Sequence, residues 1–445
     1  MKLFYSLFLS LLTVGPVVST TRFHSVYMMT NEPENEVLVF SRNRRSGELT
    51  FENAVSTNGK GLLLDGFPQD DALASQANLV VAGKCLLAVN AGSNTISSFR
   101  IRSKTRSISL AATVDSRGEI PVSIAENGGL VYVLNAGGVG SIAGFKMHPK
   151  TCMLKSIGDP TALNQTFASG PPALAFFAAS PAQVSLLYHF PHNHYFLLYL
   201  FSHHVCLIIQ IIFTPEGNLL VTIKANDAQL GDDTFPSNGS LNLYKVDEHG
   251  LTSAEDLIQT EIPGITIPFS GDYDDEGNFL LVELFPGGFP EGGASGRASL
   301  WSGIDSSSPT VESSVEITSQ RGVCWLRYSP RTSCAFTTNN GSASISALRV
   351  QDGELELVEA VAASGVNSPT EITFSPDYKF LYALSTGFTL SDDPELRQPA
   401  IFVYRVRRNC SLSLVQEITN GIPTEAERVP GNLGVVNGVV GLAAF

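Results

Sequence analysis

The stretch ITFSPDYKFLYAL, residues Ile372–Leu384, decides the fold of this chain. Its first part alternates apolar and polar residues, as a strand does when one of its faces is buried. Pro376 fixes its own φ angle inside a Ser-Pro-Asp turn, and a second apolar run begins at Phe380. The stretch therefore predicts a hairpin of two strands.

The second strand of this hairpin recurs along the chain. Its seven copies are VYMMTN from Val26, LLAVN from Leu86, VYVLN from Val131, LLVTIK from Leu219, FLLVEL from Phe279, CAFTTN from Cys334 and FLYALS from Phe380. Several copies precede a third strand and another turn, so each unit is a predicted four-stranded meander. Repeats of roughly 45 to 60 residues with four short strands are typical of a β-propeller. We therefore predict an all-β fold, a seven-bladed propeller that forms one domain over residues 20–445.

The two ends of the chain complete each other in this arrangement. The first copy begins directly at a second strand, without the inner strand that precedes the others. The last residues, VNGVVGLAAF at Val436–Phe445, resemble an inner strand and then stop. We predict that this C-terminal strand completes the first blade and closes the ring, because two sheet edges would otherwise stay unpaired.

The charge of the chain excludes one large class of function. Charged residues make up 16% of the sequence and the net charge is -14, whereas ordinary domains contain about 25% charged residues. Binding along a phosphate backbone needs a dense basic surface, so nucleic acid is not an expected partner. The acidity is most simply a source of solubility.

The N-terminus predicts export. Residues 1–19 combine Lys2, an apolar core and small residues near Ser19, as a secretory signal peptide does. Glycosylation sequons follow at Asn164, Asn238, Asn340 and Asn409. We expect a secreted glycoprotein, extracellular or in the cell wall, with a membrane-retained signal anchor as the alternative.

Four of the six cysteines fall at equivalent places in different repeats. Cys152 and Cys410 share an outer hairpin turn, and Cys85 and Cys334 share a second-strand start. Equivalent positions on different blades are too far apart to be bridged. Cys324 shares a hairpin with Cys334 but is out of register with it, so we predict at most one disulfide.

Residues 184–210 interrupt the fourth repeat and hold five of the eight histidines. Without them, Pro181-Ala182-Gln183 joins Ile211 to give PAQIIFTPEGNLLVT, which matches PTEITFSPDYKFLYAL position by position. The segment starts with Val-Ser, which GTAAGT can encode, and ends with Gln, which CAG can encode; these are common intron ends. We predict a retained intron or gene-model insertion inside blade 4.

Two other interpretations of this segment stay open. Residues 195–213 approach the length of a membrane-spanning helix, but two histidines lie in its middle and it would remove an inner strand from the ring. We expect no stable membrane insertion. A metal-binding loop is the other alternative, although its histidines lack the spacing of a dedicated site.

The motifs resemble a known family. The repeated x-F-S-P-D-x-x-x-L-Y-V-x-N unit, the run LLAVNAGSNTISSF, the run PVSIAENGGLVYVLNAGG and the ending GLAAF are similar to the seven-bladed lactonase family. That family includes propeller-type 6-phosphogluconolactonases and fungal 3-carboxymuconate cyclases, and the chain most resembles its exported fungal members. The resemblance implies a site in the central channel that acts on a small lactone or a muconate-like acid.

Two sets of positions open on one face of such a propeller. The position that starts each inner strand, here called the slot, holds Ser123, Gln183, Ser270, Trp325 and Glu371. The position that ends each second strand holds Asn31, Asn90, Asn135, Lys224, Leu284, Asn339 and Ser385. We interpret the asparagines as turn formers that tolerate left-handed backbone, with Asn90 and Asn135 as candidate substrate contacts together with the slot residues.

The charged residues at these positions suggest chemistry. Lys224 and Arg297, which we place in a Gly-rich loop, are expected to bind an anionic substrate or stabilise an oxyanion. Glu371 or Glu283 is expected to move a proton or activate water. We therefore predict Glu371, Glu283 and Lys224 as catalytic and Arg297 as substrate-binding, with no metal or other cofactor.

The histidines favour a competing function. The resemblance implies a histidine in the channel, yet outside residues 184–210 only His24, His148 and His249 remain, and none is predicted to reach it. Two functions therefore stay open: a lactonase or cyclase acting on a small anionic lactone, and an extracellular propeller that binds without turnover. In either case we expect a monomer.

Overall fold

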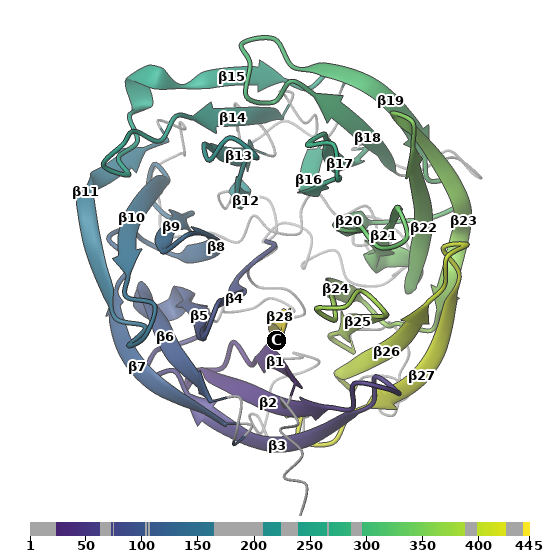
Figure 1. Cartoon of the computed structure of the whole chain (residues 1–445), viewed down its shortest axis with the longest axis horizontal. Coiled ribbons are helices and arrows are strands. Elements are labelled where there is room, and N and C mark those ends of the chain that lie inside the picture. Colours follow the sequence, from purple (N-terminus) through teal and green to yellow (C-terminus); the bar gives the residue numbers. More distant parts are fainter. Residues whose placement is uncertain are drawn as a thin grey trace, which may run out of the picture.

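The computed structural model describes residues 24–62, 73, 75–102, 105, 107–163, 208–223, 239–264, 267–285, 296–387, 398–423 and 439–445. Within them the chain forms seven four-stranded antiparallel sheets. Figure 1 shows these sheets as blades around one axis, with β4, β8, β12, β16, β20, β24 and β28 nearest the centre. The predicted seven-bladed propeller is confirmed.

The blades are numbered in the order in which their second strands occur along the chain. Blade 1 contains β28 (Val440–Ala444), β1 (His24–Met29), β2 (Glu36–Arg42) and β3 (Leu49–Ser56). Blade 2 contains β4 (Leu79–Ala82), β5 (Cys85–Asn90), β6 (Thr95–Arg102) and β7 (Ser107–Asp115). Blade 3 contains β8 (Pro121–Asn127), β9 (Leu130–Asn135), β10 (Ser141–Met147) and β11 (Leu154–Ala162).

Blade 4 contains β12 (Ile208–Phe213), β13 (Leu219–Ile223), β14 (Ser240–Tyr244) and β15 (Ile258–Glu261). Blade 5 contains β16 (Ile267–Tyr273), β17 (Phe279–Leu284), β18 (Gly296–Ser302) and β19 (Thr310–Glu316). Blade 6 contains β20 (Val323–Ser329), β21 (Cys334–Asn339), β22 (Ser344–Gln351) and β23 (Glu354–Ser364). Blade 7 contains β24 (Pro369–Phe374), β25 (Phe380–Ser385), β26 (Ala400–Val406) and β27 (Leu412–Ile418). The helical elements among the described residues are single 3-10 turns, η1 (Ala91–Ser93), η3 (Ala254–Asp256) and η4 (Asn340–Ser342).

Closure of the ring follows the prediction. The C-terminal strand β28 pairs antiparallel with β1, with Leu442 opposite Met28 and Ala444 opposite Val26. Backbone hydrogen bonds between Ser25 and Phe445 extend this pairing. Blade 1 is therefore built from both ends of the chain, which removes the two open sheet edges that an unclosed ring would carry.

The core lies between the blades. All six residues are buried in β5, in β17, in β21 and in β25, because a second strand packs against neighbouring blades on both of its faces. The outer strands carry fewer buried residues and face solvent, as β19 does. Burial of both faces explains why the second strand was the clearest repeat in the sequence.

The prediction of at most one disulfide is wrong. Cys85 bonds to Cys152 and Cys334 to Cys410, with Cα–Cα separations of 5.6 Å and 5.5 Å. Each bond joins the second-strand start of one blade to the outer hairpin turn of the next, so it links two non-equivalent positions. Both turn cysteines, Cys152 and Cys410, have left-handed backbone, with φ of 62° and 64°. Cys324 is buried and takes part in neither of these two bonds, consistent with its predicted lack of register with Cys334.

The predicted insertion falls mostly outside the described residues. Its last three residues, 208–210, open β12, so they form the inner strand of blade 4 together with Ile211 and Phe213. That end of the alternative membrane-helix segment is therefore a strand. No helix among the described ranges has the length and apolar character needed to cross a membrane.

Candidate functional site

The slot residues surround a short segment that enters the channel before β4. In this central segment, residues 75–78, the side chains of Ser75, Gln76 and Asn78 are buried. The Gln76 amide donates to the carbonyls of Gly271 and Leu326, at 3.4 Å and 3.3 Å, in blades 5 and 6. The central segment therefore fills the channel at this level.

Three predicted slot residues hold the backbone around this segment. The Ser123 hydroxyl donates to the Gln76 carbonyl at 2.6 Å and accepts from the Ile211 N–H at 3.2 Å. The Trp325 indole N–H donates to the Ser75 carbonyl at 3.1 Å. The Ser270 hydroxyl joins the backbones of Cys324 and Leu326 in blade 6. All three side chains are buried, and their predicted contact with substrate stays a prediction.

The blade 4 slot is occupied by Gln210. Its amide oxygen accepts from the Gly271 N–H at 2.8 Å, and its amide nitrogen donates to the Gly271 carbonyl at 3.0 Å. Gln183, which we predicted there, lies outside the described residues. Both glutamines fit the repeated motif. Gln210 precedes Ile211 in the full chain, and Gln183 would precede Ile211 if residues 184–210 were absent.

The asparagines at the second-strand ends act through their side chains. Asn90 donates to Thr95 at 3.1 Å and Ser97 at 2.8 Å, and Asn135 donates to the Ser116 carbonyl and the Ser141 hydroxyl. Of the repeated asparagines, only Asn31 has a positive φ, at 49°. Our interpretation as left-handed turn formers is therefore wrong for Asn90 and Asn135, where the amide ties the second strand to the third.

Glu283 and Arg297 form an ion pair inside blade 5. Glu283, on β17, lies opposite Arg297 on β18, so Arg297 belongs to a strand and not to the Gly-rich loop where we placed it. Arg297 Nε and Nη2 lie 3.0 Å and 2.7 Å from Glu283 Oε2, and the Ser299 hydroxyl donates to Oε1 at 2.6 Å. Arg297 also donates to the Pro263 carbonyl. Glu283 is buried and well provided with donors.

A second group of charges lies on the inner strands of blades 5, 6 and 7. We call Asp272 on β16, Arg327 on β20 and Glu371 on β24 the channel cluster. Arg327 Nη2 lies 3.8 Å from Glu371 Oε1, and the Tyr328 N–H donates to Asp272 Oδ2 at 3.1 Å. Glu371 is 2% exposed, and its Oε1 has no hydrogen-bond partner. The cluster thus combines a buried, incompletely bonded carboxylate with a guanidinium.

The environment of the cluster favours protonated carboxyl groups. Burial raises the pKa of Glu371 from 4.5 to about 7, although Arg327 and the backbone N–H groups of Ala77 and Ile372 act in the opposite direction. Burial also raises the pKa of Asp272, against the effect of Arg327. A carboxyl group that changes charge near neutral pH suits a general acid or base.

Sequence reasoning missed Asp272 and Arg327. Both lie two residues beyond a slot, where Asp272 pairs with Leu280 and Arg327 with Phe336. The corresponding inner-strand residues of the other blades are uncharged: Val80, Ala125, Ile212, Thr373 and Ala443. The sequence signal that could have identified Asp272 and Arg327 is a charged residue at an inner-strand position that is uncharged in the other blades.

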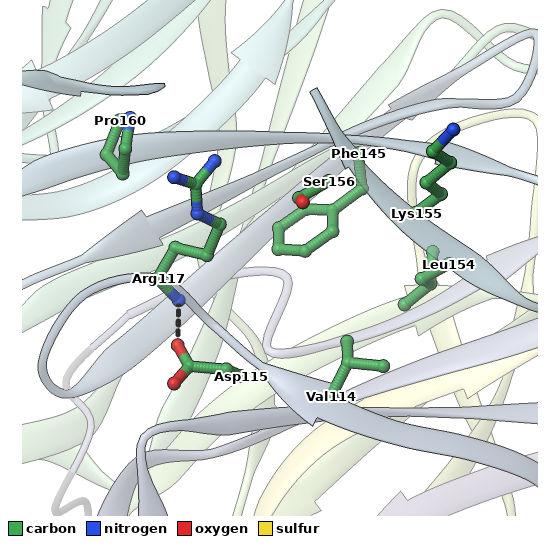
Figure 2. Close-up of a pocket in the computed structure, with 8 residues that line it drawn as sticks. All are labelled: Val114, Asp115, Arg117, Phe145, Leu154, Lys155, Ser156 and Pro160. Atoms are coloured by element: carbon green, nitrogen blue, oxygen red, sulfur yellow. Dashed lines mark hydrogen bonds between the residues drawn. The ribbon is translucent and has the colours of Figure 1, made fainter. Parts of the chain in front are cut away.

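An open groove of about 750 Å³ lies on the outer wall between blades 2 and 3. Figure 2 shows Arg117, Lys155 and Phe145 among its lining residues, with the Arg117 backbone N–H bonded to Asp115. The Arg117 guanidinium is already bound by Asp159 and by the Gly158 carbonyl. The groove therefore offers no buried reactive group comparable to Glu371.

Several predicted residues cannot be placed. Lys224, Asn164 and Asn238 lie outside the described residues, as do the histidines of 184–204. His24 starts β1, while His148 and His249 lie in outer hairpin turns. The described residues contain no group of three or more His, Cys, Asp or Glu able to hold a metal ion. Of the two described sequons, Asn409 is exposed, whereas the Asn340 amide donates to Ser368.

The fold and the channel cluster define a seven-bladed β-propeller with charged groups on three adjacent inner strands. Comparison with known proteins agrees with this class. Residues 21–168 match the family model described as "Lactonase, 7-bladed beta-propeller". No curated protein matches the chain.

Solved structures resemble the whole chain at low identity. A candidate 6-phosphogluconolactonase of Bacteroides uniformis is 16% identical over 95% of this chain and 99% of its own, with a TM-score of 0.61. A second, from Bacteroides fragilis, is 14% identical over 96% and 99%, with a TM-score of 0.59. The Pseudomonas aeruginosa periplasmic gluconolactonase is 13% identical over 91% and 98%, with a TM-score of 0.56. These similarities support the fold.

Proposed function

We propose that this protein is an exported enzyme of the lactonase type that hydrolyses a small lactone in its axial channel. The observation that carries the proposal is the buried Glu371 carboxyl group, whose unbonded Oε1 lies 3.8 Å from Arg327. The lactonase family match over residues 21–168 and the lactonase names of similar structures support the same chemistry.

Each group has a defined role in this reaction. The ionised Glu371 accepts a proton from water as that water attacks the lactone carbonyl carbon. Arg327 stabilises the negative charge that develops on the carbonyl oxygen. The tetrahedral intermediate then collapses, the ring C–O bond breaks, and Glu371 returns its proton to the alkoxide. One lactone and one water give one hydroxy acid, which releases a proton near neutral pH.

Asp272 positions Arg327 in this mechanism. Its carboxylate is held by the Tyr328 N–H and interacts electrostatically with Arg327. The guanidinium therefore lies between acidic groups of two neighbouring blades. The reversible cyclisation of a muconate-like acid, the other reaction implied by the resemblance, would use the same proton-transfer group and the same cation.

The test is proton release in a pH-stat, with purified full-length chain and a panel of sugar lactones and muconolactones. We expect turnover that falls by about a hundredfold or more in Glu371→Gln, the range for loss of a general base. Glu356→Gln is the matched control, since Glu356 is an exposed residue of the outer strand β23. A trace equal to the uncatalysed rate with every lactone, from folded protein, would reject the proposal.

Binding without turnover is the second candidate function. It is favoured by the positions of the described histidines, which lie at His24, His148 and His249, and by the slot hydroxyls already bonded to backbone. Calorimetry with the same panel separates the two functions. Heat of binding without proton release would identify a binding propeller.

The proposal that the protein is exported rests on different features. Disulfides persist in oxidising compartments, and the part of the chain that the structure describes forms two, between Cys85 and Cys152 and between Cys334 and Cys410. The signal peptide predicted at residues 1–19 and the exposed Asn409 sequon fit the same compartment. Mass spectrometry of protein from the culture medium, before and after glycosidase treatment, tests export, cleavage near Ser19 and glycosylation together.

A further inference from the structure

We infer that the channel site takes an uncharged, hydroxylated lactone and discriminates against lactones that carry a phosphate or carboxylate group. The assignment of a lactone as the substrate rests on the proposed function. The preference for an uncharged lactone rests on the charges of the described residues. It replaces the anionic substrate that the sequence suggested. It is carried by three observations: the ring of inner-strand residues, the carboxyl groups around Arg327 and the turns at one channel mouth.

The first observation is a complete ring of inner-strand positions, with one member from every blade. These residues pair with Tyr27, Leu87, Tyr132, Leu220, Leu280, Phe336 and Tyr382 of the second strands. The ring consists of Ala443, Val80, Ala125, Ile212, Asp272, Arg327 and Thr373. It holds one acid and one base, so the ring itself is neutral overall.

The second observation is that Arg327 already faces two carboxyl groups when a substrate arrives, before Glu371 has accepted a proton. Glu371 Oε1 lies 3.8 Å from its Nη2, and Asp272 acts on it from the other side. With Glu371 ionised, the channel cluster carries two negative charges and one positive charge. An anion near Arg327 would compete with both carboxylates, and like charges this close in a partly buried site repel strongly.

The third observation concerns the hairpin face, the side on which the first two strands of each blade are joined. Its described turns between first and second strands, which are the turns nearest the channel, carry more acids than bases, and of these acids Asp377 is paired with Lys379 at 3.1 Å and with Arg42 at 3.7 Å. The acids are Glu216, Asp274, Asp275, Glu276 and Asp377. The bases are Lys84, Arg331 and Lys379. Because the central segment fills the channel at the slot level, this face is the approach to the ring, and its field opposes the entry of anions.

Uncharged groups of a ligand would still find partners here. Arg327 has a side chain that is 22% exposed and can donate to a lactone carbonyl. The Thr373 hydroxyl belongs to a partly exposed ring position and can bond a sugar hydroxyl. Polar recognition without a dedicated cation fits a polyhydroxy lactone.

The experiment compares glucono-lactone with its 6-phosphate at constant ionic strength, by kcat/KM above the uncatalysed rate. We expect kcat/KM to be about tenfold or more higher for the uncharged lactone, because the phosphate adds repulsion by Asp272 and Glu371. Asp272→Asn removes one negative charge and keeps an acceptor for the Tyr328 N–H. It should shift the ratio of the two kcat/KM values toward the phosphorylated lactone by about fivefold. Asp275→Asn, in the turn, should shift it in the same direction by less.

Two results would overturn the inference while leaving the proposed function intact. They are a preference of the native protein for the phosphorylated lactone, and a substrate ratio that neither variant changes. If neither lactone is hydrolysed, the proposed function fails separately. Calorimetry with an uncharged gluconolactam and with 6-phosphogluconate then decides the charge question, and equal or tighter binding of the phosphorylated compound overturns the inference.

Discussion

Two Glu–Arg pairs in neighbouring parts of the molecule differ in how completely they are bonded. Glu283 accepts from Arg297 at 2.7 Å and 3.0 Å and from Ser299 at 2.6 Å. Glu371 lies 3.8 Å from Arg327, and one of its oxygens has no hydrogen bond. A buried carboxylate with all its donors stabilises the native structure, whereas one without them is costly to ionise and is available to react. The difference separates a structural pair from a candidate catalytic pair.

The largest expected effect is on turnover. Glu371→Gln should lower kcat for any lactone substrate by about a hundredfold or more, because the amide cannot accept a proton from water. Glu283→Gln should change kcat by less than about threefold once folded protein is compared, because its pair is structural. Steady-state kinetics on both variants measures the contrast. Equal losses in the two variants would erase the distinction between the pairs.

The second effect is the pH dependence of stability. The pKa of Glu371 is raised from 4.5 to about 7 in the folded protein. Between these pH values the carboxyl group of the native state holds a proton that the unfolded state has lost. Its contribution is full below about pH 4.5 and is lost as the pH rises through 7, by about 3 kcal/mol in all. Asp272, whose pKa is also raised, acts with the same sign.

Urea unfolding at a series of pH values, from acidic to slightly alkaline, measures how the free energy of unfolding changes with pH. The contribution of Glu371 is the difference between the native protein and Glu371→Gln. Glu371→Gln should lose less stability than the native protein as the pH rises, since its amide does not ionise. Glu356→Gln should follow the native curve. Parallel curves for the native protein and Glu371→Gln would mean that Glu371 ionises as freely in the folded chain as in the unfolded one.

The third effect is the stability of blade 5. Glu283→Gln leaves the Arg297 guanidinium without its anion, and should lower the free energy of unfolding by about 2 kcal/mol. The value lies below that for a fully buried pair, because the Arg297 side chain is 25% exposed. Thermal or urea unfolding at neutral pH provides the measurement, with Glu356→Gln as the control. No loss of stability would show that the close hydrogen bonds of this pair contribute little.

The fold could be predicted from the sequence because its information is local and repeated. Each hairpin combines a turn such as Ser-Pro-Asp with an apolar strand, and seven copies constrain one another. The closing strand β28 was recognisable for the same reason. The disulfides were missed because equivalent residues were compared with each other, whereas Cys85 and Cys152 occupy different positions on adjacent blades.

The site was only partly predictable. Glu371 was visible as the only carboxylate in a slot, but its neighbour Arg327 depends on the approach of blades 6 and 7 in space. Glu283 and Arg297 were expected at the substrate, and the structure shows them bonded to each other across β17 and β18. The position of a residue in the repeat predicts the face of the propeller on which it lies. The ion-pair partner of each charged residue depends on how strands and blades pack in space.

The smallest expected effect is that of deleting residues 184–210, and it tests whether the channel cluster depends on that segment. Deletion brings Gln183 next to Ile211, so the sequence Gln-Ile-Ile-Phe is kept at the start of the inner strand of blade 4. Gln183 should then make the two bonds to Gly271 that Gln210 makes, at 2.8 Å and 3.0 Å. We expect the deleted chain to keep the native stability within about 1 kcal/mol and the native pH profile of turnover.

Urea unfolding and pH-stat kinetics of the deleted chain measure both quantities. Gln183→Ala in the deleted chain, and Gln210→Ala in the full chain, are matched substitutions at the same slot. Each should destabilise its own chain by about 1 to 3 kcal/mol through the unpaired Gly271 backbone. If Gln183→Ala has no effect in the deleted chain, Gln183 does not replace Gln210, and residues 184–210 contribute the slot of blade 4 in their own right.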